Sequence, residues 1–114
     1  MSFDLAFWWQ DSPPNREEAA QVYDKLTDGL EGVVEESPAI EAFYQAVISM
    51  FPDLAEDNTH DSPWSSSIYV TQECVIVAIS WSRAGEISSI LLELAAKHGL
   101  TAYDPQDHVV HEAR

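Results

Sequence analysis

Basic residues are scarce in this chain: five Lys and Arg stand against 20 Asp and Glu, for a formal net charge of −15. Binding to nucleic acid depends on Lys and Arg that displace counterions from phosphates, so we expect no nucleic-acid partner, and for the same reason no anionic membrane surface. The excess acid is concentrated in residues 1–62, whose net charge is −12, against −3 in residues 63–114. Two interpretations stay open: the charge keeps a small domain soluble, or it contacts a basic protein partner.

Cysteine, glycine and long apolar runs are also scarce. The single Cys74 excludes an intrachain disulfide and a cysteine-based zinc cluster, and it fits a reducing compartment. Four glycines supply no phosphate-cradling loop, and no metal or cofactor motif is present. The most apolar run, Cys74 to Trp81, is too short to span a bilayer, and no basic and apolar leader follows Met1. We therefore expect a cytoplasmic protein without a cofactor and without a membrane partner.

The patterns that are present predict one α+β domain. Alternating or continuous apolar residues predict strands at 3–9, 66–71, 74–81 and 100–103. Helical periodicity predicts three helices, which begin after caps at Asn15, Ser37 and Ser82 and end at Gly29, Pro52 and Gly99. The order β-α-α-β-β-α-β is that of a ferredoxin-like split β-α-β sandwich with one extra helix. We expect a four-stranded sheet over residues 1–105 and a C-terminal tail over 106–114. Right-handed crossovers should place the first and third strands, 3–9 and 74–81, side by side at the centre and the helices on one face.

The other face of this sheet is predicted to be too apolar to stay open. If Val75, Val77, Ile79 and Trp81 face the helices, then Cys74, Ile76, Ala78 and Ser80 face away from them. A second copy of the chain would cover such a face in a symmetric homodimer, and the tail is the other candidate cover.

Candidate chemistry centres on the tryptophans. Trp8, Trp64 and Trp81 are predicted near the ends of the two central strands, where they would line an aromatic ligand pocket, with His60 and Asp61 supplying polar groups. The alternative interpretation is that the tryptophans pack in the core and that His60 and Asp61 belong to a solvated acidic loop. His108 and His111 are possible metal ligands or part of a mobile tail. No G-x-S-x-G motif is present.

Four short motifs carry a resemblance that runs through most of the chain. They are Phe3-Asp4-Leu5-Ala6 with Trp8, Asp61-Ser62-Pro63-Trp64, Trp81-Ser82-Arg83-Ala84, and His98-Gly99-Leu100 with Tyr103-Asp104-Pro105-Gln106. With them the chain resembles a family of small acidic, mainly actinobacterial single-domain proteins of undetermined function. The resemblance implies a bacterial origin and a single domain, and it carries over no catalytic residue.

Two functional hypotheses follow, besides a dimerising accessory domain without a ligand. In the first, the protein is a non-enzymatic interaction module, similar in size and charge to bacterial immunity proteins, that binds a basic partner. Its candidate contact residues are acidic: Glu35, Glu36, Asp53, Glu56 and Asp57. In the second, it is a small-ligand-binding domain or a small hydrolase-like enzyme that uses the tryptophan-lined pocket with His60 and Asp61.

Overall fold

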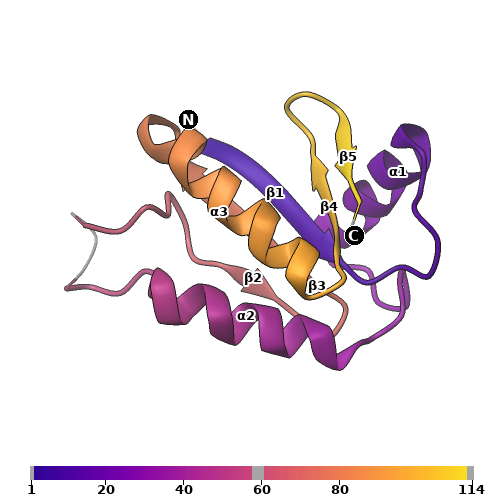
Figure 1. Cartoon of the computed structure of the whole chain (residues 1–114), viewed down its shortest axis with the longest axis horizontal. Coiled ribbons are helices and arrows are strands. Elements are labelled where there is room, and N and C mark those ends of the chain that lie inside the picture. Colours follow the sequence, from indigo (N-terminus) through magenta and orange to yellow (C-terminus); the bar gives the residue numbers. More distant parts are fainter. Residues whose placement is uncertain (1, 58–60, 113–114) are drawn as a thin grey trace.

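In the computed structural model, which describes residues 2–57 and 61–112, a five-stranded antiparallel sheet carries helices on both of its faces (Figure 1). The strand order is β2-β3-β1-β4-β5. The elements along the chain are β1 (Ser2–Trp8), α1 (Arg16–Thr27), α2 (Pro38–Met50), β2 (Tyr69–Val70), β3 (Cys74–Ser80), the 3₁₀ turn η1 (Trp81–Arg83), α3 (Ala84–Lys97), β4 (Thr101–Asp104) and β5 (Val109–His111).

The centre of the sheet is the antiparallel pair β1 and β3. All seven residues of each strand are paired, from Ser2 opposite Ser80 to Trp8 opposite Cys74. The expectation that the first and third strands lie side by side is confirmed. Alternation along these two strands gives the sheet two apolar faces, and each of them needs a cover.

One face is covered by α2 and α3. Leu5, Phe7 and Val77 pack there against side chains such as Phe43 of α2 and Leu91 of α3, all at most 1% exposed. The rings of Phe7 and Phe43 lie 4.7 Å apart, centre to centre. The helical periodicity in the sequence therefore marks the core-facing side of these two helices.

Helix α1 covers the opposite face, which corrects the expectation that all helices share one face. Ala19 and Leu26 of α1 are buried together with Ala6, Trp8 and Cys74 of the sheet. Because these sheet residues are apolar, burying this face as well stabilises the fold. Helix α1 buries it at one end of the sheet. Part of the surface that we expected a second copy of the chain to bury is thus covered within the monomer.

The sheet has five strands instead of the expected four, because residues expected to form a tail return as β5. Val110 of β5 pairs with Tyr103 of β4 and packs on the α1 side of the sheet. In the connecting turn, His108 has a φ of 56°, and its Nδ1 lies 2.7 Å from the Tyr103 hydroxyl. An apolar pair, Val109 and Val110, inside a charged segment is the sequence signal for this strand.

Two boundaries also differ from expectation. Strand β2 is shorter than the predicted 66–71, because Trp64 pairs with Ile79 and Tyr69 pairs with Ile76, which leaves two extra residues bulged out between the pairs. Ser82 does not cap α3, since it lies inside η1.

No helix within the described ranges is long and apolar enough to cross a membrane.

Candidate functional site

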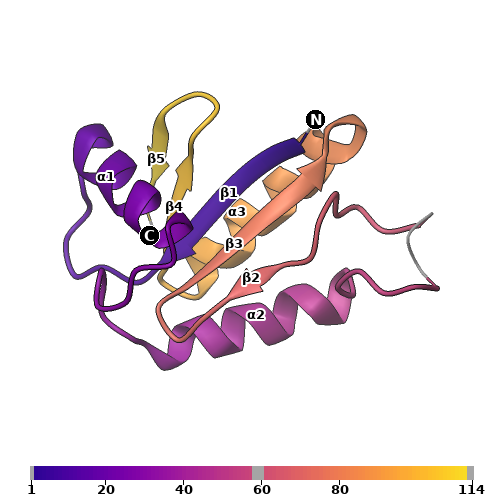
Figure 2. The same cartoon turned by 180° about the vertical axis from the view of Figure 1, so that it is seen from behind.

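A hollow of about 600 Å³ opens between the start of α2 and the edge strand β2; we call it the edge groove. Figure 2 shows α2 running alongside β2 at this edge of the sheet. The groove is lined by Glu36, Ser37, Pro38 and Glu41 from the α2 side and by Val70, Thr71 and Gln72 from the β2 side. Its walls contain two carboxylates and neither Lys nor Arg.

The local sequence fixes where the α2 wall begins. The Ser37 side chain accepts a hydrogen bond of 3.2 Å from the Ala39 N–H, and Pro38 occupies the first helical turn, where its missing N–H costs nothing. The Ser37 N–H in turn donates to the Gln72 carbonyl at 3.4 Å. This bond links the start of α2 to the β2–β3 turn and thereby joins the two walls.

A second hollow, of about 320 Å³, adjoins the edge groove and shares Glu36, Thr71 and Gln72 with it. It lies between the end of α1, the connector 29–36 and the β2–β3 turn. Glu31 adds a carboxylate to its wall, while Leu26, Leu30, Val34 and Tyr69 are among its apolar lining residues. Leu30 and Tyr69 are two of the most exposed large apolar side chains of the described chain, at 53% and 43%.

Glu73 holds the connector in place. It is buried, and its carboxylate accepts hydrogen bonds from the backbone N–H groups of Gly32, Val33 and Val34 at 2.9, 2.9 and 3.1 Å. These backbone hydrogen bonds, above all that of Gly32, lower the pKa of Glu73, because they favour its ionised form. Gly32 has a φ of 72°, which a side chain would oppose. Glu73 therefore fixes the backbone of the connector that carries Glu31 and Glu36.

The exposed carboxylates that line the two hollows have no neutralising Lys or Arg among the described residues. Glu31, Glu36 and Glu41 form no ion pair with any of the described lysines and arginines. The Glu41 carboxylate accepts one hydrogen bond, of 2.6 Å, from the Gln45 amide. Because the groove holds neither His nor Cys, its chemistry suits recognition of a cation better than catalysis.

The acidic residues predicted to contact a partner do not form one surface. Glu35 and Glu36 are exposed just before α2, whereas Glu56 and Asp57 are exposed beyond its other end. A helix of this length is about 20 Å long, so the two pairs are well separated. Only Glu36 lines the edge groove. Glu41, which lines it too, resembles an ordinary solvent-facing helix residue in the sequence.

Asp53, another predicted contact residue, makes hydrogen bonds within the fold. It is only partly exposed, and its Oδ1 accepts hydrogen bonds from the backbone N–H groups of Leu54 and Ile68 at 2.8 and 2.9 Å. Asp53 therefore ties the segment after α2 to the segment that leads into β2. Its contact with a partner stays a prediction.

The predicted tryptophan pocket does not assemble. Trp8 and Trp64 are 0% and 3% exposed and belong to the cores on opposite faces of the sheet. Trp81 is 53% exposed and lies beside Phe3, with ring centres 5.9 Å apart. His60 lies outside the described residues. Core packing, the alternative interpretation, accounts for Trp8 and Trp64.

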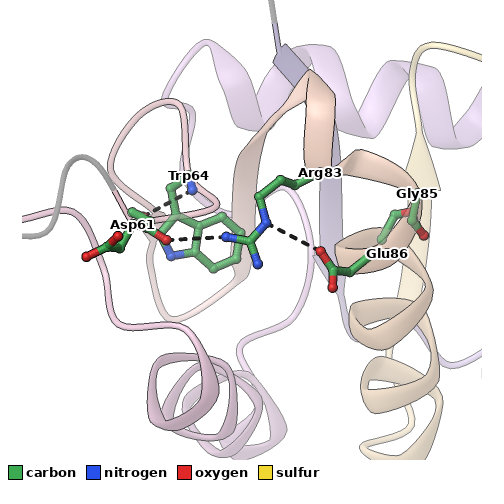
Figure 3. A network of polar contacts seen from close by, with 7 residues as sticks. Asp61, Trp64, Arg83, Gly85 and Glu86 are labelled. Carbon is green, nitrogen blue, oxygen red and sulfur yellow. Dashed lines mark hydrogen bonds and ion pairs between the residues drawn. The ribbon is translucent and has the colours of Figure 1, made fainter.

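Asp61 and Trp64 belong to a network that fastens the segment after the acidic loop (Figure 3). Arg83 extends from η1, donates from Nη1 to the Asp61 carbonyl at 3.3 Å, and forms a 3.3 Å ion pair with Glu86 through Nε. The Trp64 indole N–H donates to the carbonyls of Phe51 and Pro52, each at 3.1 Å. These contacts hold the fold together. The bond between Arg83 and Asp61 joins the motif at 81–84 to the motif at 61–64.

The other two motifs are joined through Gln106. Its side-chain oxygen accepts from the Asp4 N–H at 2.6 Å, and its amide nitrogen donates to the Asp4 carbonyl at 2.8 Å. Strand β4 ends at Asp104, and Pro105 follows it. Because proline has no N–H, its backbone cannot donate a hydrogen bond to β1. The Gln106 side chain makes the two bonds to the Asp4 backbone instead. The Gln106 side chain thereby continues the hydrogen bonding of β1 beyond the end of β4.

Cys74 is a poor nucleophile, and the described residues hold no metal-ligand cluster. Burial raises the pKa of the Cys74 thiol, which opposes the thiolate form needed by a nucleophile. Within residues 2–57 and 61–112, no group of three or more His, Cys, Asp or Glu side chains is arranged to hold a metal ion.

Comparison with known proteins finds no matching family model, no matching curated protein and no matching solved structure. Function is therefore inferred from the geometry and charge of the edge groove.

Proposed function

We propose that this protein is a non-enzymatic interaction module that binds a basic partner protein at the edge groove, in the manner of a bacterial immunity protein in the cytoplasm. The observation that carries the proposal is the pair of carboxylates, Glu36 and Glu41, in the walls of a hollow that contains no Lys or Arg. Glu73 and the bond between Ser37 and Gln72 hold these walls before a partner arrives. A prearranged site loses less conformational entropy on binding.

The charge distribution supports a basic partner over a neutral one. Residues 1–62, which contribute the connector and all of α2, carry a net charge of −12. Such a field attracts a cationic protein over about one Debye length, ~8 Å at physiological salt, and it raises the association rate more than it raises the affinity. Binding should therefore weaken as salt is added.

We also propose that the sheet is a ferredoxin-like arrangement with additions. The order β2-β3-β1-β4, all antiparallel, together with α2 and α3 on one face supports this relation, with α1 on the second face and β5 at the edge as the additions. A fold of this kind serves many unrelated functions, so it adds no activity to the proposal.

The small-ligand or hydrolase-like alternative has less support. It depends on Trp8, Trp64 and Trp81 lining one cavity, and two of these indoles are buried on opposite faces of the sheet. A homodimer through the sheet face beyond α1 stays a prediction for sedimentation analysis.

Affinity capture from the native lysate tests the interaction proposal, with the double variant Glu36→Lys/Glu41→Lys beside the wild type. The matched control is Glu17→Lys/Glu93→Lys, which makes the same change in charge at two exposed positions, one of them again in the first turn of a helix. We expect one basic protein, identified by mass spectrometry, to bind the wild type and the control, to elute with salt, and to be lost with the groove variant. Equal capture by both double variants would contradict the proposal.

A further inference from the structure

The backbone of β2 has one unpaired position on its outer edge. Residues of an antiparallel pair alternate between exchanging hydrogen bonds with the partner strand and pointing their N–H and C=O groups away from it. The Thr71 N–H donates to the Cys74 carbonyl at 2.9 Å, so the neighbouring Val70, opposite Val75, points its N–H and C=O groups away from β3. Among the described residues, no hydrogen bond joins the N–H or the C=O of Val70 to any part of the chain outside the sheet.

The positions on either side of Val70 along this edge are occupied by the chain itself. The Ile68 N–H donates to the Asp53 carboxylate at 2.9 Å, and the Gln72 carbonyl accepts from the Ser37 N–H at 3.4 Å. The protein thus closes both ends of an edge that would otherwise recruit other strands. Val70 is left open, and it lines the edge groove.

We propose that an extended basic segment of the partner adds to the sheet at β2, pairing its backbone with Val70 in the edge groove. This inference rests on the proposed function and specifies how that site is used. Strand addition gives affinity through backbone hydrogen bonds and specificity through alternate side chains. Val70 packs toward the α2 side of the sheet and Tyr69 lies on the other side, so alternate side chains of the added strand meet different surroundings.

Those two surroundings define the chemistry of the segment. On the α2 side the added strand faces Glu36 and Glu41, which suit Lys or Arg side chains. On the other side it lies beside Tyr69, a 43% exposed aromatic ring that suits apolar side chains. The expected motif alternates basic and apolar residues. A second copy of this chain is a poor occupant, because its net charge of −15 repels the same carboxylates.

The test uses a blocked six-residue peptide of alternating Val and Lys, titrated into the ¹⁵N-labelled full chain and followed by NMR and amide hydrogen exchange. We expect the largest shifts at Val70 and its neighbours, and exchange of the Val70 amide slowed by about tenfold or more. A peptide N-methylated at every residue, which presents no N–H group on either edge, should lose both effects. A Val-Glu peptide should not bind.

Two variants separate the backbone from the side chain. Val70→Pro removes the outward N–H without removing a bond to β3, and we expect it to weaken peptide binding about fivefold or more, whereas Val70→Ala keeps the N–H and should bind nearly as the wild type does. If Val70→Pro does not fold, the N-methylated peptide still decides the question.

Each other outcome overturns the inference. Binding with shifts centred elsewhere, or equal binding of the N-methylated peptide, contradicts strand addition but leaves the basic-partner proposal standing. A peptide that does not bind also contradicts strand addition, while the proposed function is judged separately by the lysate capture with Glu36→Lys/Glu41→Lys. Val70 protection in the peptide-free protein, together with a dimer in sedimentation, would make a second copy the occupant.

Discussion

Two groups of carboxylates lie close together at the β2–β3 end of the molecule and behave in opposite ways. Glu73 is buried, and its carboxylate accepts hydrogen bonds from three backbone N–H groups. Glu36, on the connector that Glu73 holds, is exposed and lines both hollows without an ion pair to any described Lys or Arg. A net charge of −15 therefore does not describe one surface, because some acidic residues stabilise the fold and others remain available to a partner.

The same division runs through the rest of the chain. Asp104 is buried in β4, and its Oδ1 accepts hydrogen bonds from the Gln106 and Asp107 N–H groups and from the Gln106 amide. Asp53 belongs with it as a fold-building carboxylate. Substitutions of the two groups should therefore separate stability from binding.

The largest expected effect is that of Glu73→Ala. The change leaves three backbone N–H groups without their acceptor and releases the connector, so we expect a loss of about 3 kcal/mol in the free energy of unfolding, measured by urea titration. Glu73→Gln, which keeps an uncharged acceptor oxygen, should lose about half as much. A loss of under about 0.5 kcal/mol for Glu73→Ala, the level of an ordinary surface change, would mean that this carboxylate does not hold the connector.

Asp104→Ala should follow, with a loss of about 2 kcal/mol, because it removes the acceptor that orders the β4–β5 turn. The same variant should loosen the Gln106 side chain, whose amide bonds both Asp104 and the Asp4 backbone. Hydrogen exchange at Asp4 reports on that second effect. Unchanged exchange at Asp4 would show that Gln106 holds β1 without help from Asp104.

A smaller effect is expected from pH, again through Glu73. Its pKa is lowered in the folded state, so its stabilisation is complete above the unfolded value of about 4.3 and is lost as pH falls from there through the lowered folded value. The gap in stability between the wild type and Glu73→Gln should be constant from neutral pH down to about pH 5.5 and shrink in more acid solution. Urea midpoints measured from pH 7 to pH 3 give this gap, and a gap that does not change with pH would contradict the assignment.

The smallest effect on stability is expected from Glu36→Gln/Glu41→Gln. Both side chains are exposed, and the change relieves repulsion between like charges while removing one helix-dipole contact, so the free energy of unfolding should stay within about 0.5 kcal/mol of the wild type. Thermal and urea unfolding check this value. A larger loss would move the two residues into the fold-building group.

Local signals in the sequence predicted much of the fold. Asn15 caps α1 as expected through a 2.8 Å bond from the Glu18 N–H, and the Glu18 carboxylate returns a 3.0 Å bond to the Asn15 N–H. Gly99 ends α3 with a φ of 73°. These features depend on residues at most a few positions apart. The pairing of the first and third strands followed from apolar patterning combined with the rule for right-handed crossovers.

The sequence did not predict features that depend on distant contacts. Glu73 reads as a turn residue, and its partners lie about 40 positions earlier in the chain. The choice of sheet face for α1 depends on Ala6 and Trp8 needing a cover, although an amphipathic helix fits either face. Exposed acidic residues look alike in a sequence, so the division between Asp53 and Glu41 needed the structure.

The most direct measurement of this division is the affinity of the alternating Val-Lys peptide for three proteins at low salt. These are the wild type, Glu36→Gln/Glu41→Gln, and the control Glu17→Gln/Glu93→Gln, which removes the same charge elsewhere. We predict that the groove variant binds about tenfold more weakly than the control, with unchanged stability, and that raised salt narrows this difference. Equal weakening in both variants would mean that the peptide responds only to net charge, and the account of the edge groove would be wrong.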